Sequence, residues 1–225
     1  MENEKESQLP VVSANSGTLM GGIDPHSYLN RTAITHTGKI MSFRDFRKYS
    51  PIFIETGASM GGGIVQAIEA EYQIVKSVEA KDDYFQHCVN NFHTDSRVSL
   101  YHGLSKDNLE KMLSDVKEPA VFWLDAHVSG SNSAGYEDWL EKGEESDYAQ
   151  HKALMAELSI VLKHRNDHVV LVDDQNGVHE TTKIYIDMFL SVNPKYKFYF
   201  YDEQRDPREG ARYKDKILVA IPETQ

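Results

Sequence analysis

The sequence predicts an α/β domain built on a mostly parallel β-sheet that ends in an antiparallel hairpin. From residue 51 onward, short β-branched runs alternate with longer helical patterns, which is typical of βαβ units. The first run passes directly into a glycine-rich turn. The last two runs are joined by a short segment that contains proline and glycine. These three observations together define the predicted fold class.

The predicted parallel strands are short and rich in β-branched and aromatic residues. They lie at 51–55, 72–79, 97–101, 120–125 and 168–173. Helical patterns separate them near 63–70, 82–92, 106–115 and 149–164. In the last pattern, Leu154, Leu158 and Val161 recur at helical spacing. We therefore expect successive strands to lie parallel, each pair joined by a helix.

The C-terminal part departs from this alternation. A further helical pattern at 181–192 is followed by two strand-like runs, YKFYFYD and RYKDKILVAI. The segment between them, QRDPREGA, contains turn residues and is too short for a helical crossover. The sheet should therefore end in a hairpin.

Length and composition favour one main domain. A chain of 225 residues with 40% hydrophobic residues can bury one sizeable core. Residues 1–20 are rich in Glu, Ser, Asn and Gly, so we expect a mobile N-terminal arm before a single domain at 21–225. No apolar run is long enough to span a membrane, and the first residues lack a signal-peptide pattern. We expect a cytoplasmic protein.

Charge and cysteine content exclude some functions. The net charge of −11 disfavours a surface that follows a phosphate backbone, so nucleic acid is not an expected partner. The single cysteine, Cys88, cannot form an internal disulfide, and we expect it to be a small buried residue. The sequence leaves a homodimer open.

The turn after the first strand is ETGASMGGG, residues 55–63. Glycines at such a junction let the backbone turn tightly and approach a ligand closely. A tight turn without a ligand would use the same residues, so this signal is weak by itself. The spacing of Gly57, Gly61 and Gly63 also differs from the Gly-x-Gly-x-x-Gly of dinucleotide-binding domains.

A second signal comes from the ends of the next two strands. Glu79 ends the second strand about 20 residues beyond the first glycine, where an acid binds ribose hydroxyls in nucleotide-binding folds. The alternative is a solvated acid at a strand end. Gly103 and Ser105 follow the third strand, where Ser105 could equally be an ordinary helix cap.

Three acidic residues follow the fourth and fifth strands. Asp125 ends the fourth strand, and Asp173 and Asp174 end the fifth. Carboxyl ends of parallel strands meet at one sheet edge, and close carboxylates repel unless they are protonated or bind a hard divalent cation. Alternatively, Asp125 and Asp173 could accept backbone hydrogen bonds, and Asp174 could form an Asx-turn with the following residues.

The glycine turn and the acids together resemble the class I S-adenosylmethionine-dependent methyltransferases. The turn is similar to motif I of that class, whose Rossmann-like sheet has seven mostly parallel strands and ends in an antiparallel hairpin. The lines FWLDAHVSG and LVDDQNG resemble small metal-dependent sugar O-methyltransferases, including antibiotic-sugar and viral or bacterial glycan-modifying branches. This resemblance covers about residues 50–222.

The resemblance implies roles for the residues that carry it. The turn would hold the amino-acid part of S-adenosylmethionine, Glu79 the ribose and the segment after the third strand the adenine, with Asp125 beside the donor. Mg²⁺ or Mn²⁺ would bind at Asp125, Asp173 and Asp174. The implied donor-binding set is Glu55, Gly57, Ala58, Gly61, Gly63, Glu79, Gly103, Ser105 and Asp125.

The resemblance also implies a general base. In the antibiotic-sugar branch an aspartate two positions after the first metal ligand takes this role, and here that position is His127. Histidine suits the task because its pKa lies near neutrality. His127 could instead be a metal ligand or an ordinary loop residue, with His179 as the reserve candidate. The implied reaction is O-methylation of a small-molecule or glycan hydroxyl, with Asp125 and His127 as catalytic residues.

Two segments are candidates for covering the site. The insertion at 129–148 is long for a strand-to-helix loop, so it predicts a lid in which Tyr136 and Trp139 could pack on a sugar ring; a solvated acidic loop is the alternative. The segment at 24–48 precedes the first predicted strand and could cross the donor pocket, with Tyr28, Arg31 and Lys39 available for contacts.

Two other functions compete with methyl transfer. An NAD-linked oxidoreductase would use a similar α/β architecture, but the glycine spacing and the terminal hairpin argue against it. A non-catalytic partner protein could keep a methyltransferase fold without activity. The glycine turn together with all three acids argues against this second alternative.

Overall fold

The computed structural model describes residues 33–126, 146–175, 177–203 and 213–223. All of them belong to one compact unit, Thr32–Gln225. The predicted arm at 1–20 lies outside the described residues, as does the predicted insertion up to residue 145. The last residues of that insertion belong to a helix that begins at Ser146.

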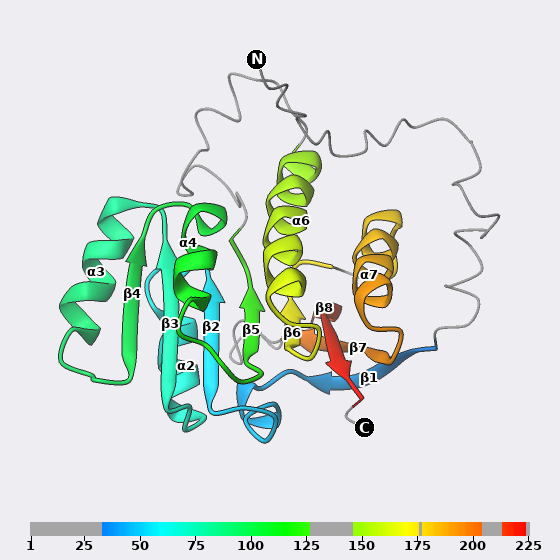
Figure 1. The fold of residues 1–225 in the computed structure, drawn as a ribbon, viewed down its shortest axis with the longest axis horizontal. Coiled ribbons are helices and arrows are strands. Elements are labelled where there is room, and N and C mark those ends of the chain that lie inside the picture. The colour runs from blue at the N-terminus through cyan, green and yellow to red at the C-terminus, as the bar shows by residue number, and fades with distance from the viewer. Residues whose placement is uncertain (1–32, 127–145, 176, 204–212, 224–225) are drawn as a thin grey trace, which may run out of the picture. The chain divides into compact units, whose positions relative to one another are not determined.

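The described strands form one mixed sheet in the order β1-β7-β8-β6-β5-β2-β3-β4 (Figure 1). The five predicted parallel strands are present and lie parallel to one another. The predicted terminal hairpin is also present, with its second strand antiparallel to both of its neighbours. The bounds are β2 (Ile52–Thr56), β3 (Ile74–Glu79), β4 (Val98–His102), β5 (Val121–Leu124), β6 (Val169–Val172), β7 (Tyr196–Glu203) and β8 (Tyr213–Pro222).

The sheet has one strand more than the seven expected. Strand β1 (Ile34–Ile40) comes from the segment that was expected to cross the pocket, and it pairs in parallel with β7 at the sheet edge. The His36 ring stacks on Phe200 with centroids 5.4 Å apart, and the Thr37 hydroxyl donates to the Phe200 carbonyl at 2.8 Å. The segment is mostly polar because it is an exposed edge strand, so the sequence lacks a strong strand pattern there.

The helices lie where the sequence predicts them, within a few residues at each end. Helices α4, α6 and α7 pack side by side on one face, and Figure 1 shows α2 behind the sheet in that view. A short 3₁₀ helix, η1, contacts α2. The bounds are η1 (Phe43–Asp45), α2 (Gly62–Glu69), α3 (Asp82–Phe92), α4 (Ser105–Leu113), α6 (Ser146–His164) and α7 (Glu180–Val192).

The core lies on both faces of the central strands. Every residue of β2, β5 and β6 is buried, as expected for parallel strands covered by helices on both sides. Phe43 of η1 packs against Phe53 and Trp123, with ring centroids 4.7 and 5.4 Å away. Among the described helices, none is long and apolar enough to cross a membrane.

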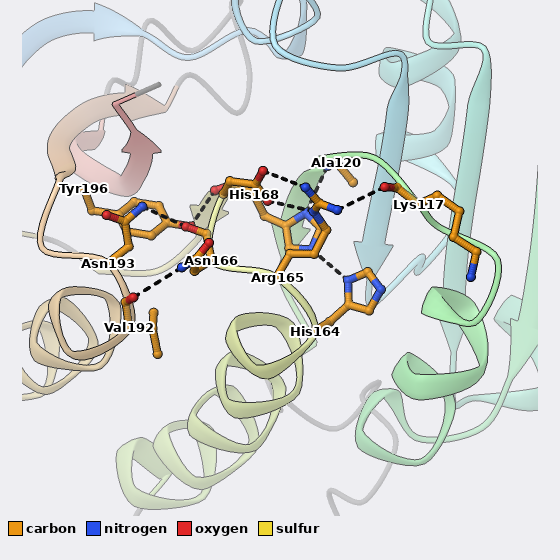
Figure 2. Close-up of polar contacts among 10 residues, drawn as sticks. Lys117, Ala120, His164, Arg165, Asn166, His168, Val192, Asn193 and Tyr196 are labelled. Atoms are coloured by element: carbon orange, nitrogen blue, oxygen red, sulfur yellow. Dashed lines mark hydrogen bonds and ion pairs between the residues drawn. The ribbon is translucent and has the colours of Figure 1, made fainter. Parts of the chain in front are cut away.

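Polar contacts join the starts of β5 and β6 (Figure 2). The Nδ1 atom of buried His168 accepts the backbone N–H of Ala120 at 3.0 Å, and the Tyr196 hydroxyl donates to the His168 carbonyl at 2.8 Å. Arg165 donates to the Lys117 carbonyl at 3.0 Å. These bonds anchor two neighbouring strands at one end, so the register also fixes which residues meet at their other end.

Candidate active site

A cavity of about 1200 Å³ opens at the carboxyl ends of the strands. It lies where the strand order changes direction, because β3 follows β2 on one side while β5 and β6 follow on the other. Ligands of open α/β sheets bind at such a point. The cavity is lined by all nine residues predicted to bind the donor except Gly61, by Asp173, and by Met41, Phe43, Trp123, Lys152 and Glu203 among others.

The turn after β2 requires glycine at two positions, for two different reasons. Gly57 has φ +84°, and a Cβ there would lie 2.7 Å from the carbonyl oxygen of Asp125. The N–H groups of Gly57 and Ala58 both donate to the Val78 carbonyl at 3.0 Å. A Cβ on Gly63 would collide with the Glu55 carboxylate. The turn therefore packs tightly between the ends of β3 and β5.

Glu55 is a buried acid at the floor of the cavity. Its carboxylate accepts the Ser77 hydroxyl at 2.5 Å and lies against Gly63. Burial raises the pKa of Glu55 to about 7, and the neighbouring Glu79 also raises it, while the Ser77 hydrogen bond lowers it. Near neutral pH this carboxyl is therefore protonated in part of the molecules.

Glu79 ties two loops together at the cavity wall. One carboxylate oxygen accepts the N–H of Ser59 at 2.7 Å, and the other accepts the N–H of Lys81 at 2.8 Å. A carboxylate has about four acceptor sites, so capacity for ligand hydroxyls remains. Glu79 therefore has a structural role that the sequence did not indicate.

The segment after β4 reaches the same cavity. Gly103 has φ +118°, and its N–H donates to the Glu79 carbonyl at 2.9 Å. Ser105 is the first residue of α4, and Leu104 occupies the cap position without a side-chain cap bond. Ser105 therefore lines the cavity rather than serving as the helix cap.

Asp125 and Asp173 meet side by side at the ends of β5 and β6. The register pairs Leu124 with Val172, so the following aspartates are neighbours, and their side chains are hydrogen-bonded to each other. Burial, the Asp173 carboxylate and Glu55 raise the pKa of Asp125 well above its usual range. Two neighbouring buried carboxyl groups that interact in this way share a proton or attract a cation.

The third predicted metal ligand has a different partner. The Asp174 carboxylate is ion-paired with Lys216 of β8, and Asp174 has φ +59°. Its N–H donates to Asp173 Oδ1 at 2.7 Å, and Asp174, unlike Asp173, does not line the large cavity. Within the described ranges, no three His, Cys, Asp or Glu side chains are arranged to hold a metal. The structure thus brings together two of the three predicted ligands.

The structure does not describe His127, the predicted base, and it places the reserve candidate His179 outside the cavity lining. His127 lies outside the described residues, directly after Ala126, which lines the cavity. His179 is exposed and occupies the cap position of α7, where its N–H donates to the Thr182 hydroxyl at 3.3 Å. His179 does not line this cavity. Tyr28, Arg31, Tyr136 and Trp139 also lie outside the described residues.

Several cavity residues were not singled out from the sequence. Ile40 and Met41 reach the cavity because β1 runs parallel to β7 and ends at the same sheet edge. Glu203 reaches it as the last residue of β7. Its position directly after an aromatic strand was a usable signal, whereas nothing in the polar β1 segment indicated a strand end.

Buried Glu157 of α6 contacts the end of β2 beneath the cavity lining. The Thr56 hydroxyl donates to Glu157 Oε2 at 3.2 Å, and the Asp125 N–H donates to the Thr56 Oγ1 at 3.3 Å. This chain of contacts links α6 to the point where Asp125 leaves β5. Glu157 therefore helps to orient the backbone of Asp125, and it does not itself line the large cavity.

Solved structures match this chain in fold at low sequence identity, whereas no protein-family model and no curated protein sequence matches it. An O-methyltransferase from Bacillus cereus, solved in complex with SAH, matches with a TM-score of 0.51 at 12% identity, covering 91% of this chain and 94% of that one. The O-methyltransferase TomG from Streptomyces achromogenes, solved in complex with SAM, matches with a TM-score of 0.48 at 11% identity, covering 79% of this chain and 75% of that one.

The match to the Bacillus cereus protein extends over nearly the whole of both chains. At this identity the similarity concerns the fold alone. The chain therefore has the Rossmann-like fold of the class I methyltransferases, with a mostly parallel sheet and an antiparallel β7–β8 hairpin.

Proposed function

We propose that this protein is an S-adenosylmethionine-dependent O-methyltransferase that acts on a hydroxyl group. One observation carries the proposal: the glycine turn, Glu79 and the Asp125–Asp173 pair all line the same large cavity. The glycine turn and a pair of acids thus surround one space, at the sheet edge where open α/β sheets bind ligands.

The residues of this cavity fit S-adenosylmethionine. The donor supplies a methyl group activated by a positively charged sulfur. Acidic side chains line the cavity, Glu79 among them, which suits a ligand that carries this positive charge. We assign the turn with Glu55, Gly57, Ala58 and Gly63 to the amino-acid part, with Gly61 shaping this turn from outside the cavity. We assign Glu79 to the ribose, and Gly103 with Ser105 to the adenine.

The size of the cavity supports an acceptor beside the donor. Pockets for drug-sized ligands have volumes of about 300–1000 Å³, so a cavity of about 1200 Å³ can hold more than one small molecule. We propose a sugar or glycan hydroxyl as the acceptor, because the lines around Asp125 and Asp173 resemble sugar O-methyltransferases. Met41, Phe43 and Trp123 add an apolar wall on which a ring could pack.

The aspartate pair fits a divalent cation in part. Mg²⁺ is commonly bound through one or two carboxylates with water or substrate oxygens completing its shell, and Asp125 and Asp173 offer such a pair. Mg²⁺ or Mn²⁺ held there would supply positive charge that lowers the pKa of the acceptor hydroxyl. Asp174 does not fit this set, because its carboxylate is engaged by Lys216.

We assign proton removal to His127, which follows Asp125 by two positions in the sequence. The acceptor oxygen would bond to the methyl carbon as the bond from that carbon to the donor sulfur breaks, which leaves S-adenosylhomocysteine, and the hydroxyl proton would pass to the imidazole of His127. Asp125, held by backbone contacts to Thr56, orients the acceptor at the end of β5. The enzyme's main work would be alignment of the hydroxyl with the methyl group and exclusion of water.

A methyl-transfer assay tests this proposal. Purified protein is incubated with labelled S-adenosylmethionine and a panel of amino- and neutral-sugar acceptors, and S-adenosylhomocysteine is quantified. We expect His127→Ala and Asp125→Asn each to lose roughly 10²- to 10⁴-fold in kcat, the range typical of acid–base groups. The exposed His93→Ala serves as the matched control and should retain the rate. A fully active Asp125→Asn protein would rule out the assigned role of the pair.

A further inference from the structure

Lys216 is a buried lysine whose position is set by the backbone of the sheet. It lies in β8, and only 7% of its surface is exposed. β6 and β8 are antiparallel with Val172 opposite Leu218, and continuing this register places residue 174 opposite residue 216. The Gln175 N–H donates to the Lys216 carbonyl at 2.8 Å, which carries the pairing past the end of β6.

This pairing brings the Lys216 ammonium onto the Asp174 carboxylate. Asp174 adopts a left-handed backbone conformation there, which aspartate tolerates better than most residues. A buried ammonium needs an anionic partner, and separating the pair would leave a charge buried without compensation. The contact between Lys216 and Asp174 is therefore built into the strand pairing and is costly to break.

Resting on the methyl-transfer function proposed above, we propose that Lys216 is a positioning residue that holds Asp174 out of the metal ligand set. A divalent ion at this site takes carboxylates from Asp125 and Asp173 only. The ammonium of Lys216 neutralises the third carboxylate, so the local charge that attracts a cation is smaller than three aspartates would give. Divalent-ion affinity is lower for the same reason, since ligand charge count tunes affinity.

The test is calorimetric titration of the full chain with Mn²⁺, without donor or acceptor. Asp173→Asn should lose about 10-fold or more in affinity, whereas Asp174→Asn should bind Mn²⁺ as the unmodified chain does. Lys216→Met should bind about 10-fold more tightly, because Asp174 is released to act as a third carboxylate. The double variant Lys216→Met/Asp174→Asn should lose that gain.

Several results would overturn the inference. They are an Asp174→Asn protein as weak as Asp173→Asn, a folded Lys216→Met protein with unchanged or weaker affinity, and the absence of Mn²⁺ binding in both the unmodified chain and Lys216→Met. Circular dichroism checks that each variant is folded. If Lys216→Met does not fold, the comparison of Asp174→Asn with Asp173→Asn decides the question alone.

A parallel titration with S-adenosylmethionine separates this inference from the proposed function. Mn²⁺ affinities in the predicted order, without donor binding in any protein, would refute methyl transfer and leave the role of Lys216 intact. Donor binding together with equal Mn²⁺ losses in Asp173→Asn and Asp174→Asn would refute the role of Lys216 alone.

Discussion

Glu79 illustrates how a single residue can be placed correctly from sequence while its contacts are not. Its position after an apolar strand predicted a residue at the ligand edge, and it does line the cavity. The two backbone N–H groups that it accepts, from Ser59 and Lys81, depend on the path of two loops. Sequence spacing carries no information on such contacts, so the loop-fixing role emerged only from the structure.

His168 provides a pH-dependent prediction at the residue scale. Its Nδ1 accepts the Ala120 N–H, so the folded state needs the neutral imidazole (Figure 2). The pKa of His168 is lowered to about 4, mainly by burial, with a contribution from the neighbouring His164 and Arg165 that Asp167 opposes. Because an unfolded histidine titrates near 6.5, the unfolded chain binds this proton first as the pH falls.

The free energy of unfolding should therefore drop between about pH 6.5 and pH 4 by up to about 3 kcal/mol through His168. His168→Gln removes the titration and should flatten this part of the pH profile, although it lowers stability at neutral pH through poorer packing. Urea unfolding at several pH values measures both effects. The exposed His93→Gln is the control and should keep the full slope. An unchanged slope in His168→Gln would contradict the assignment.

At the level of elements, periodicity and turn residues were enough to predict twelve of the fourteen described strands and helices, but not β1 or the short η1. The central strands are buried on both faces, and their β-branched runs are therefore unambiguous. β1 is an exposed edge strand with polar residues, whose pairing depends on contacts with Phe200 in β7, far away in the sequence. Only long-range pairing distinguishes such a segment from a loop.

In the candidate site, too, local sequence patterns predicted some features, and long-range pairing determined the others. Strand ends predicted that Asp125, Asp173 and Asp174 would gather at one edge, and parallel register does bring the first two together. The contact made by Asp174 depends instead on β8, the antiparallel partner of β6, because β8 places Lys216 opposite Asp174. A lysine within the apolar run of β8 was visible in the sequence, but its partner depends on a register that the sequence alone does not fix.

The start of helix α2 offers a matched pair of substitutions. Gly61 has φ +85°, and a Cβ there would lie 2.5 Å from the Phe92 ring, whereas a Cβ on Gly62 would meet open space. Gly61→Ala should therefore destabilise the protein by about 1–3 kcal/mol. Gly62→Ala should be neutral or stabilise it by up to about 1 kcal/mol. Urea unfolding compares the two, and equal effects would show that the contact with α3 does not constrain this turn.

For the whole molecule, the arrangement of strand ends explains why one cavity collects so many functional groups. Among the strands that the structure describes, the carboxyl ends of all except β8 face one edge, and β8 runs the other way. The glycine turn, the acid pair and the apolar wall therefore converge on the same space. Such convergence is what binding of a donor beside an acceptor requires.

Gly62 gives the means to test donor binding in this cavity without disturbing the fold. It lines the cavity, it is helical, and added atoms at its Cβ position meet nothing within 4 Å. Gly62→Phe should therefore fold and occupy part of the donor space. Val65, on the same helix, is 43% exposed and does not line the cavity, so Val65→Phe adds a comparable ring outside it.

The most direct test is calorimetric titration of S-adenosylmethionine into the unmodified chain, Gly62→Phe and Val65→Phe, with NAD as the competing ligand class. We expect one bound donor per chain in the unmodified protein and in Val65→Phe, loss of binding in Gly62→Phe, and no heat with NAD. Donor binding that survives in Gly62→Phe, or binding of NAD but not of S-adenosylmethionine, would contradict the assignment of this cavity as a methyl-donor site.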